Sequence, residues 1–307
     1  MKLLLRFTLL SVSVVTAVNT VFAQQDPQYS MYMFDKMAIN PAAAGSKDAM
    51  EATLISRDQW TDIPGAPQTN ALMLEAPVTS QKFGWGVEFL NDNIGPVSSN
   101  SIQANYAYHL RLFNGQLSMG LGLGVYDYDI NFAKISYKDA SDPMNTYANS
   151  AQIVPNADFG LYYYSNTFYL GASFNHLIQA QQTSNSPVDS ASFRPHLYLM
   201  AGKGFQLSQN VLFSPSFVVK CAENAPLTAD FNADFLLQEK LWLGAGYRTD
   251  YGFTFLAAYR ALESLQIGFA YDLGLNAIGQ AGGGTYEVSL TVDFGKRKMV
   301  QVSPRYM

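Results

Sequence analysis

The sequence predicts an all-β fold, a transmembrane up-and-down antiparallel β-barrel of about 14 strands and of the outer-membrane type. Three observations lead to this prediction. Polar and apolar residues alternate in segment after segment, no apolar run beyond residue 23 approaches the roughly 18 residues of a membrane helix, and the connections sort into short and long ones. Charged residues make up only 14% of the chain and aromatic residues another 14%, which suits a wall that faces lipid.

Residues 1–23 have the pattern of a secretory signal peptide. Lys2 and Arg6 form a basic start, an apolar run follows, and Ala23 provides the small residue at a cleavage site. Polar residues within the run argue against an uncleaved membrane anchor. We therefore expect export through a cleaved signal peptide, with Gln24 as the first residue of the mature chain.

Strand-like alternation is clearest near the C-terminus, where Val288 and Leu290 share one face with the aromatic ends of the segment while Glu287 and Ser289 share the other. The same period recurs about fourteen times. The segments lie near residues 50–61, 66–78, 82–91, 97–110, 115–129, 154–164, 166–178, 193–206, 210–222, 225–238, 240–249, 251–261, 263–274 and 283–295.

The lengths of the connections give independent support for a barrel. Every connection after an even-numbered segment is tight, as at Asn114-Gly115, whereas the three longest, near 130–153, 179–192 and 275–282, all follow odd-numbered segments. A barrel places alternate connections at opposite rims, with short turns on the periplasmic side. A soluble β-sandwich or propeller would not sort them in this way. Both termini of the barrel, the start of its first strand and the end of its last strand, are thus expected at the periplasmic rim.

Four regions follow from this pattern. The signal peptide occupies residues 1–23, a periplasmic N-terminal segment 24–49, the outer-membrane β-barrel 50–295 and a short periplasmic C-terminal tail 296–307. The segment 24–49 is polar, contains several aromatic residues and is too irregular for a membrane strand. It could plug the lumen, strap the periplasmic rim or remain a disordered leader.

The sequence contains no candidate for catalysis, for a cofactor or for a metal. Gly120, Gly122 and Gly124 lie inside a strand pattern with no helix after them, so they do not form a nucleotide-binding loop. The three histidines are scattered over separate strands, and Cys221 is the only cysteine. A net charge of -5 gives no electrostatic footprint for nucleic acid. We expect a protein that is not an enzyme.

Eight charged residues fall on the polar, inward-facing registers of the predicted strands. A water-filled lumen is the expected setting for such charges, and an organised ion path or a docking surface is the alternative. The eight residues are Glu88, Asp230, Asp234, Arg248, Arg260, Asp272, Glu287 and Asp293.

More specific motifs begin at the expected mature N-terminus and continue along the chain. The first are Asp26-Pro27-Gln28, Tyr32-Met33, Asn40-Pro41-Ala42 and Gly45. With these motifs the sequence resembles the PorP/SprF family, outer-membrane components associated with the type IX secretion system and the gliding machinery of Bacteroidetes. Pairs such as Tyr247-Arg248 and Tyr271-Asp272 extend the resemblance over essentially the whole mature chain. The positions that we take as possible partner-binding or structural residues are Asp26, Pro27, Gln28, Tyr32, Met33, Asn40, Pro41, Gly45, Arg57 and Trp60.

The resemblance implies a non-enzymatic barrel in the bacterial outer membrane that works beside the type IX translocon. Its implied partners are outer-membrane lipid, type IX secretion components and a secreted cargo or adhesin protein, which it would anchor at the surface or couple to periplasmic machinery. A general diffusion channel is the alternative, because about 14 strands lie between filled barrels and wide porins.

Overall fold

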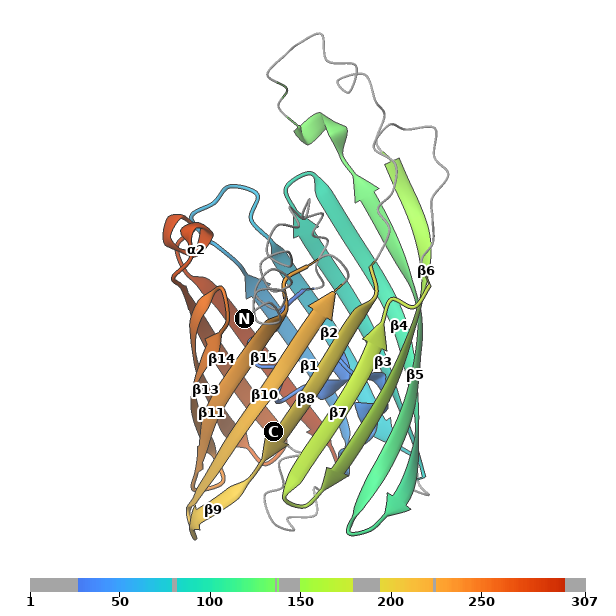
Figure 1. Ribbon diagram of the computed structural model, residues 1–307, viewed down its shortest axis with the longest axis vertical. Coiled ribbons are helices and arrows are strands. Elements are labelled where there is room, and N and C mark those ends of the chain that lie inside the picture. Colours follow the sequence, from blue (N-terminus) through green and yellow to red (C-terminus); the bar gives the residue numbers. More distant parts are fainter. Residues whose placement is uncertain are drawn as a thin grey trace, which may run out of the picture.

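The chain forms a closed antiparallel β-barrel of 14 strands (Figure 1). The computed structural model describes residues 27–78, 82–135, 137, 150–178, 194–222 and 225–295. Strands β8 and β9 both pair with β10 and form one strand that is interrupted at Gly204. The bounds are β1 Met50–Asp58, β2 Gln68–Pro77, β3 Phe83–Ile94, β4 Val97–Leu112, β5 Gly115–Ile130, β6 Ser150–Ser165, β7 Phe168–Asn175, β8 His196–Lys203, β9 Phe205–Ser208, β10 Val211–Ala222, β11 Thr228–Leu237, β12 Leu241–Arg248, β13 Gly252–Leu262, β14 Leu265–Gly274 and β15 Thr285–Phe294.

Each strand pairs with its neighbours in the sequence, and β15 pairs with β1 to close the ring. The closing register runs from Met50 opposite Phe294 to Asp58 opposite Tyr286. This topology confirms the predicted up-and-down barrel, and all fourteen predicted segments coincide with strands to within a few residues. The largest differences are β6, which begins four residues before its predicted start, and the break between β8 and β9.

Among the described residues, helices are few and short. Three 3₁₀ turns, η1 Lys36–Ala38, η2 Pro41–Ala43 and η3 Phe132–Lys134, accompany one short α-helix, α2 Ala277–Ala281. Within the described residues, no helix is long and apolar enough to cross a bilayer.

The two faces of the wall follow the predicted registers. Leu290 and Phe269 face outward and are 39% and 46% exposed, whereas Thr291 and Ala270 face inward and are buried. Because large apolar side chains cover the outside on strand after strand, the outer face matches a hydrocarbon environment. The predicted assignment of lipid-facing and inward residues is confirmed at these positions.

The interior is not an open, water-filled tube. The N-terminal segment, which we define as residues 27–49, lies inside the barrel (Figure 1, blue) and is almost entirely buried. All of the eight predicted inward charges except Arg260, which is half-buried, are buried. The water-filled setting expected for these charges is therefore wrong, because protein atoms occupy the space around them.

The two ends of the barrel differ as predicted. One end, the short-turn end, carries tight connections such as Phe113-Asn114 between β4 and β5. The other, the long-loop end, carries the connections around η3 and α2 (Figure 1). The signal peptide 1–23, the residues 24–26 that include Asp26, and the tail 296–307 lie outside the described residues.

The wall provides a direct test of the register. Leu290→Arg is expected to impair folding strongly, because an arginine near the bilayer midplane on the lipid face costs about 2–4 kcal/mol. Ser101→Arg is the control, since Ser101 is only partly buried and borders a cavity inside the barrel. The fraction of folded barrel in each variant is measured after refolding by its heat-modifiable electrophoretic migration. Equal loss of folded barrel in the two variants would contradict the register.

Candidate functional site

The N-terminal segment contacts opposite walls of the barrel, and inward glycines make room for it. A Cβ on Gly120 would lie 2.2 Å from the backbone nitrogen of Ala42, and a Cβ on Gly84 would lie 2.1 Å from the carbonyl oxygen of Ala44. Larger residues at these two positions would push the segment off the wall. Three groups of polar contacts then fix the segment in place, and they define the candidate site.

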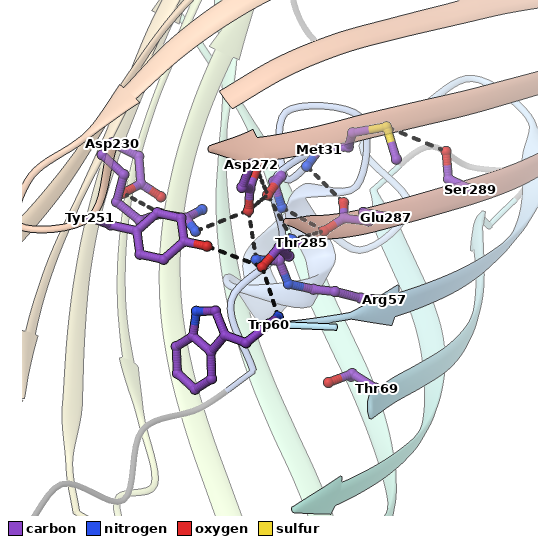
Figure 2. A network of polar contacts seen from close by, with 12 residues as sticks. Met31, Arg57, Trp60, Thr69, Asp230, Tyr251, Asp272, Thr285, Glu287 and Ser289 are labelled. Atoms are coloured by element: carbon purple, nitrogen blue, oxygen red, sulfur yellow. Dashed lines mark hydrogen bonds and ion pairs between the residues drawn. The ribbon is translucent and has the colours of Figure 1, made fainter. Parts of the chain in front are cut away.

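The first group surrounds Arg57 on β1 (Figure 2). Arg57 Nη1 lies 2.8 Å from Glu287 Oε2 and Nη2 lies 2.7 Å from Asp272 Oδ2. Ser30 Oγ accepts a hydrogen bond from Arg57 Nη1 and donates one to Asp272, each at 2.7 Å. The backbone N–H groups of Ser30 and Met31 donate to the two Glu287 oxygens at 2.7 and 2.8 Å. One arginine and two carboxylates thus bind the N-terminal segment to three strands.

This group lies at the seam that closes the barrel, because Arg57 on β1 is directly opposite Glu287 on β15. It continues along the wall through Arg248, which lies 3.6 Å from Asp272 and 3.0 Å from Asp230. Lys220 lies 3.1 Å from the other oxygen of Asp230. We call these six residues the charge chain, and their signs alternate in the order Lys220, Asp230, Arg248, Asp272, Arg57, Glu287.

The charge chain is a demanding arrangement to bury. Arg57 and Glu287 are 1% and 0% exposed, so water does not screen them. Removing ions from water is costly, and the cost is recovered only where the remaining hydrogen bonds are also made. Here the amides and hydroxyl of the N-terminal segment supply part of these bonds. In the filled barrel, the N-terminal segment therefore replaces part of the water that would otherwise solvate the charge chain.

The second group fixes the middle of the segment to the other side of the barrel. Asn40 Nδ2 donates to the carbonyl oxygens of Leu161 on β6 and Ala172 on β7, at 3.0 and 3.3 Å. Its Oδ1 accepts from the backbone of Ala42 at 2.9 Å and caps η2. Ser118 on β5 adds a 2.6 Å hydrogen bond to the Ala42 carbonyl. The segment therefore bridges the seam strands and β5–β7.

The third group lies where the segment enters β1 at the short-turn end. Lys47 Nζ pairs with Glu51, and it lies 3.1 Å from Glu75 Oε1 and 2.9 Å from the carbonyl oxygen of Phe34. The backbone of Gly45 donates to the other oxygen of Glu75 at 3.0 Å, and a φ of +65° there favours glycine. Burial acts to lower the pKa of Lys47, but the two carboxylates outweigh it and raise the pKa above its usual value.

Asp35 and Lys36 lie beside this third group and are both buried. Burial raises the pKa of Asp35 to about 7, and the nearby charge of Lys47 offsets only part of the effect. Burial and the charge of Lys47 together lower the pKa of Lys36 to about 7. Lys36 Nζ donates to the Met33 carbonyl at 2.5 Å and lies 4.7 Å from the centroid of the Tyr169 ring. Asp35 Oδ1 has no hydrogen-bond partner among the described residues.

Asp35→Asn is expected to stabilise the folded protein at pH 8 and to have little effect near pH 4. The folded pKa of Asp35 lies above the usual 3.8, so the folded state holds this proton more tightly than the unfolded state. The resulting stability is lost as the pH rises from about 4 to about 7. Asparagine avoids the loss because it carries no charge.

The measurement for Asp35→Asn is the melting temperature of the detergent-solubilised protein at the two pH values. Asp48→Asn is the control, because Asp48 is a partly exposed carboxylate on the same segment. An equal gain from Asp35→Asn at pH 4 and pH 8 would show that the buried charge is not the cause.

The structure brings many of the predicted site residues together. Arg57, Asp230, Arg248, Asp272 and Glu287 form one network, and Asn40, Pro41 and Gly45 belong to the other two groups. Tyr32 and Met33 are buried in the segment, where the Tyr32 hydroxyl accepts a 3.0 Å hydrogen bond from Asn232.

Other predicted residues lie apart from these groups. Pro27, Gln28 and Glu88 border a cavity between the segment and strands β3–β10. Trp60 adopts a positive φ of 49° in the loop after β1, and Asp293 lies opposite Glu51 at the short-turn end. Arg260 is half-buried and donates a 3.4 Å hydrogen bond to Gln266. Asp234 is buried opposite Ser214, and neither carboxylate oxygen has a hydrogen-bond partner within the described residues.

Sequence reasoning missed Lys47, Glu51, Glu75, Ser30 and Lys220. Glu51 could have been found, because it shares the inward register of β1 with Thr53, Ile55 and Arg57. No local signal identifies Ser30 or Lys47, since both belong to a segment without regular periodicity. In the part of the chain that the structure covers, no group of three or more metal-ligating side chains is present.

The comparison with protein families decides the identity. Residues 21–292 match the family described as "Type IX secretion system membrane protein PorP/SprF". The chain belongs to the PorP/SprF family. The resemblance expected from the sequence is thereby confirmed, and the protein is a type IX secretion barrel of the outer membrane. A search of curated protein sequences gave no significant match.

Solved structures similar to this PorP/SprF protein are outer-membrane barrels. The CymD monoaromatic hydrocarbon channel has a TM-score of 0.52 and 10% identity, covering 86% of this chain and 94% of its own. Omp33 of Acinetobacter baumannii has a TM-score of 0.47 and 10% identity, covering 81% and 100%. The toluene transporter TodX of Pseudomonas putida has a TM-score of 0.46 and 10% identity, covering 88% and 94%. At such low identity the likeness to CymD concerns the fold alone.

Proposed function

We propose that this PorP/SprF protein is a platform that holds a secreted surface protein, such as an adhesin, on the outer membrane and couples it to periplasmic machinery of the type IX system. The observation that carries the proposal is the filled lumen. The N-terminal segment bridges opposite walls and is tied to them by the buried ion pairs of Lys47 and by hydrogen bonds. A diffusion channel needs a continuous water path, so this interior supports a holding role over a conducting one.

The proposal includes an orientation. Cleavage after Ala23 and export would place the short-turn end in the periplasm, where the segment joins β1, and the long-loop end at the cell surface. A cargo protein would then be held from the long-loop end, and periplasmic components would contact the short-turn end. In a gliding bacterium of the Bacteroidetes, an adhesin held in this way would be linked to the motility machinery.

Deletion of the gene is the test of the platform role. Surface-exposed cargo is expected to move into the culture medium, and this loss from the cell is measured by quantitative mass spectrometry of washed cells and medium. Complementation with the native gene should restore retention, and a variant changed only at an exposed short-turn residue, Arg111→Gln, serves as a matched control. Unchanged retention of every surface protein, together with robust conductance of the intact barrel in planar bilayers, would favour the diffusion channel instead.

A further inference from the structure

Among the described residues, one strand of the barrel has an edge that is unpaired over its outer half. β6 pairs with β5 from Ser150 to Ser165 but with β7 only from Phe159 to Tyr164. One further backbone hydrogen bond, from Leu177 to Ala157 at 2.9 Å, lies beyond that ladder. Figure 1 shows β6 continuing past the end of β7. Among the described strands, none pairs with residues 150–156 on this side. Closed barrels normally remove such edges.

A buried polar corner creates this edge. His176, the residue after β7, has a φ of +58°, which a strand cannot continue. Its backbone N–H donates to Asp158 Oδ1 at 2.8 Å, and its ring Nδ1 lies 2.9 Å from Asn156 Oδ1. Gln103 holds the other Asp158 oxygen at 2.8 Å. The chain therefore leaves the sheet at a fixed point, and β6 extends beyond it with β5 as its pairing partner among the described strands.

The direction of the backbone groups on this edge follows from Pro155. Pro155 lies opposite Val125 on β5 and has no N–H, so it cannot exchange the pair of hydrogen bonds that alternate residues make with β5. Its carbonyl must point to the free side, as that of Ala157 does. With a period of two, Ile153 and Ala151 point the same way. The edge thus offers two N–H groups, of Ala151 and Ile153, and the carbonyls of residues 151, 153 and 155.

The side chains beside the edge indicate what would pair with it. Ile153 is 76% exposed, which is high for an isoleucine in a strand. On β5, Asp127 lies opposite Ile153 and Asp129 lies opposite Ala151, and Asp127 is exposed. An added strand would lie next to Ile153. Long basic side chains on that strand could reach the carboxylates of Asp127 and Asp129. Apolar β-branched residues interspersed with lysine or arginine complement this surface.

We propose that residues 151–155 of β6 bind an extended, basic segment of a partner polypeptide by adding it as a strand to the barrel. This mode of recognition uses main-chain hydrogen bonds for affinity and neighbouring side chains for specificity. The inference deepens the proposed function and rests on it in one respect, because the retained surface protein would supply the segment. Asp158 and His176, which fix the end of β7, also line the cavity inside the barrel.

The test uses a fluorescein-labelled heptapeptide, Lys-Val-Thr-Val-Lys-Val-Thr, and the full-length protein in detergent, with binding followed by fluorescence anisotropy. The native protein should bind this peptide, and the same peptide methylated on alternate backbone nitrogens should bind at least about tenfold more weakly, because main-chain donors are lost. A peptide with glutamate in place of both lysines should also bind more weakly, and high salt should reduce the difference.

Variants of the edge make the test specific. Ala151→Pro combined with Ile153→Pro removes both N–H groups of the free edge and should weaken binding about tenfold or more. The barrel should still fold, since native Pro155 already occupies the same orientation. Ile153→Ala keeps the N–H group and is the matched control, expected to retain most of the affinity. Pro155→Thr adds a donor and should strengthen binding.

Equal binding of the methylated peptide, or of the double proline variant, would overturn the strand-addition proposal, as would absence of binding by the native protein. Equal binding of the acidic peptide would overturn the basic partner. Failure of the proposed platform function would give a different result. Surface proteins would then be retained after gene deletion, while the purified protein would still bind the peptide.

Discussion

Deleting residues 26–45 is expected to leave a folded barrel that conducts ions. The strands begin at Met50, and the deleted stretch contributes no strand to the ring, so closure between β1 and β15 remains. What is lost is the material that fills the lumen. We expect the deletion protein to show resolvable single-channel steps in planar bilayers, whereas the intact protein should show little or no conductance.

The opened lumen should prefer cations. On the described strands, nine carboxylates that are now buried would face water, against four basic residues that are now buried or half-buried. The carboxylates are Glu51, Glu75, Glu88, Asp158, Asp230, Asp234, Asp272, Glu287 and Asp293, and the basic residues are Arg57, Lys220, Arg248 and Arg260. Reversal potentials in a salt gradient measure this selectivity.

Arg111→Gln, at the exposed short-turn rim, is the control for the deletion, because it changes charge without touching the lumen. Equal conductance of the intact and shortened proteins would mean that the N-terminal segment does not block the pore. The same deletion also examines the platform role in cells. If the segment contributes to holding a partner, cargo should be released even though the shortened barrel is still inserted.

Arg57→Met is expected to destabilise the folded protein by about 3–5 kcal/mol, because it leaves Glu287 and Asp272 buried with unbalanced charge. Both carboxylates lie within 2.8 Å of the guanidinium, and Arg248 remains near only one of them. The effect should appear as a lower melting temperature and as cleavage of the N-terminal segment by added protease, since the first group of contacts holds that segment.

Arg260→Met is the matched control for Arg57, because Arg260 is also an inward arginine but is half-buried, and its hydrogen bond to Gln266 is long at 3.4 Å. Its loss should cost roughly 0–1 kcal/mol. Adding Glu287→Gln and Asp272→Asn to Arg57→Met should restore part of the stability, since the stranded charges disappear. A melting temperature that falls equally for Arg57→Met and Arg260→Met would contradict the role assigned to the charge chain.

The strands and their faces were accessible from the sequence because a membrane barrel separates lipid from interior at every residue. Leu290 and Phe269 had to be outside for the same reason that Glu287 and Asp272 had to be inside. The alternation is local, so a window of ten residues contains it. The family was accessible too, through motifs such as Asn40-Pro41 and Tyr271-Asp272, and the match over residues 21–292 confirms it.

Other parts of the strand pattern were less accessible. Two features could not be predicted in this way, the break at Gly204 and the outer extension of β6 to Ser150. Neither changes the local residue composition or the two-residue alternation enough to be recognised in the sequence. The edge of β6 depends on where β7 ends, and β7 ends because the Asp158 carboxylate accepts the His176 N–H. Such a contact between two strands is decided by their register, which the pattern of one strand does not reveal.

By itself the sequence determined the barrel, the number of strands, the two ends and the family, because each of these depends on short-range periodicity, turn length or local motifs. Only the tertiary structure decided what fills the barrel and which charges pair. Arg57 meets Asp272 and Glu287 across 215 and 230 residues of chain, and Ser30 joins them from a segment without periodicity. These contacts arise from ring closure, which brings the first and last strands together and encloses the N-terminal segment between them.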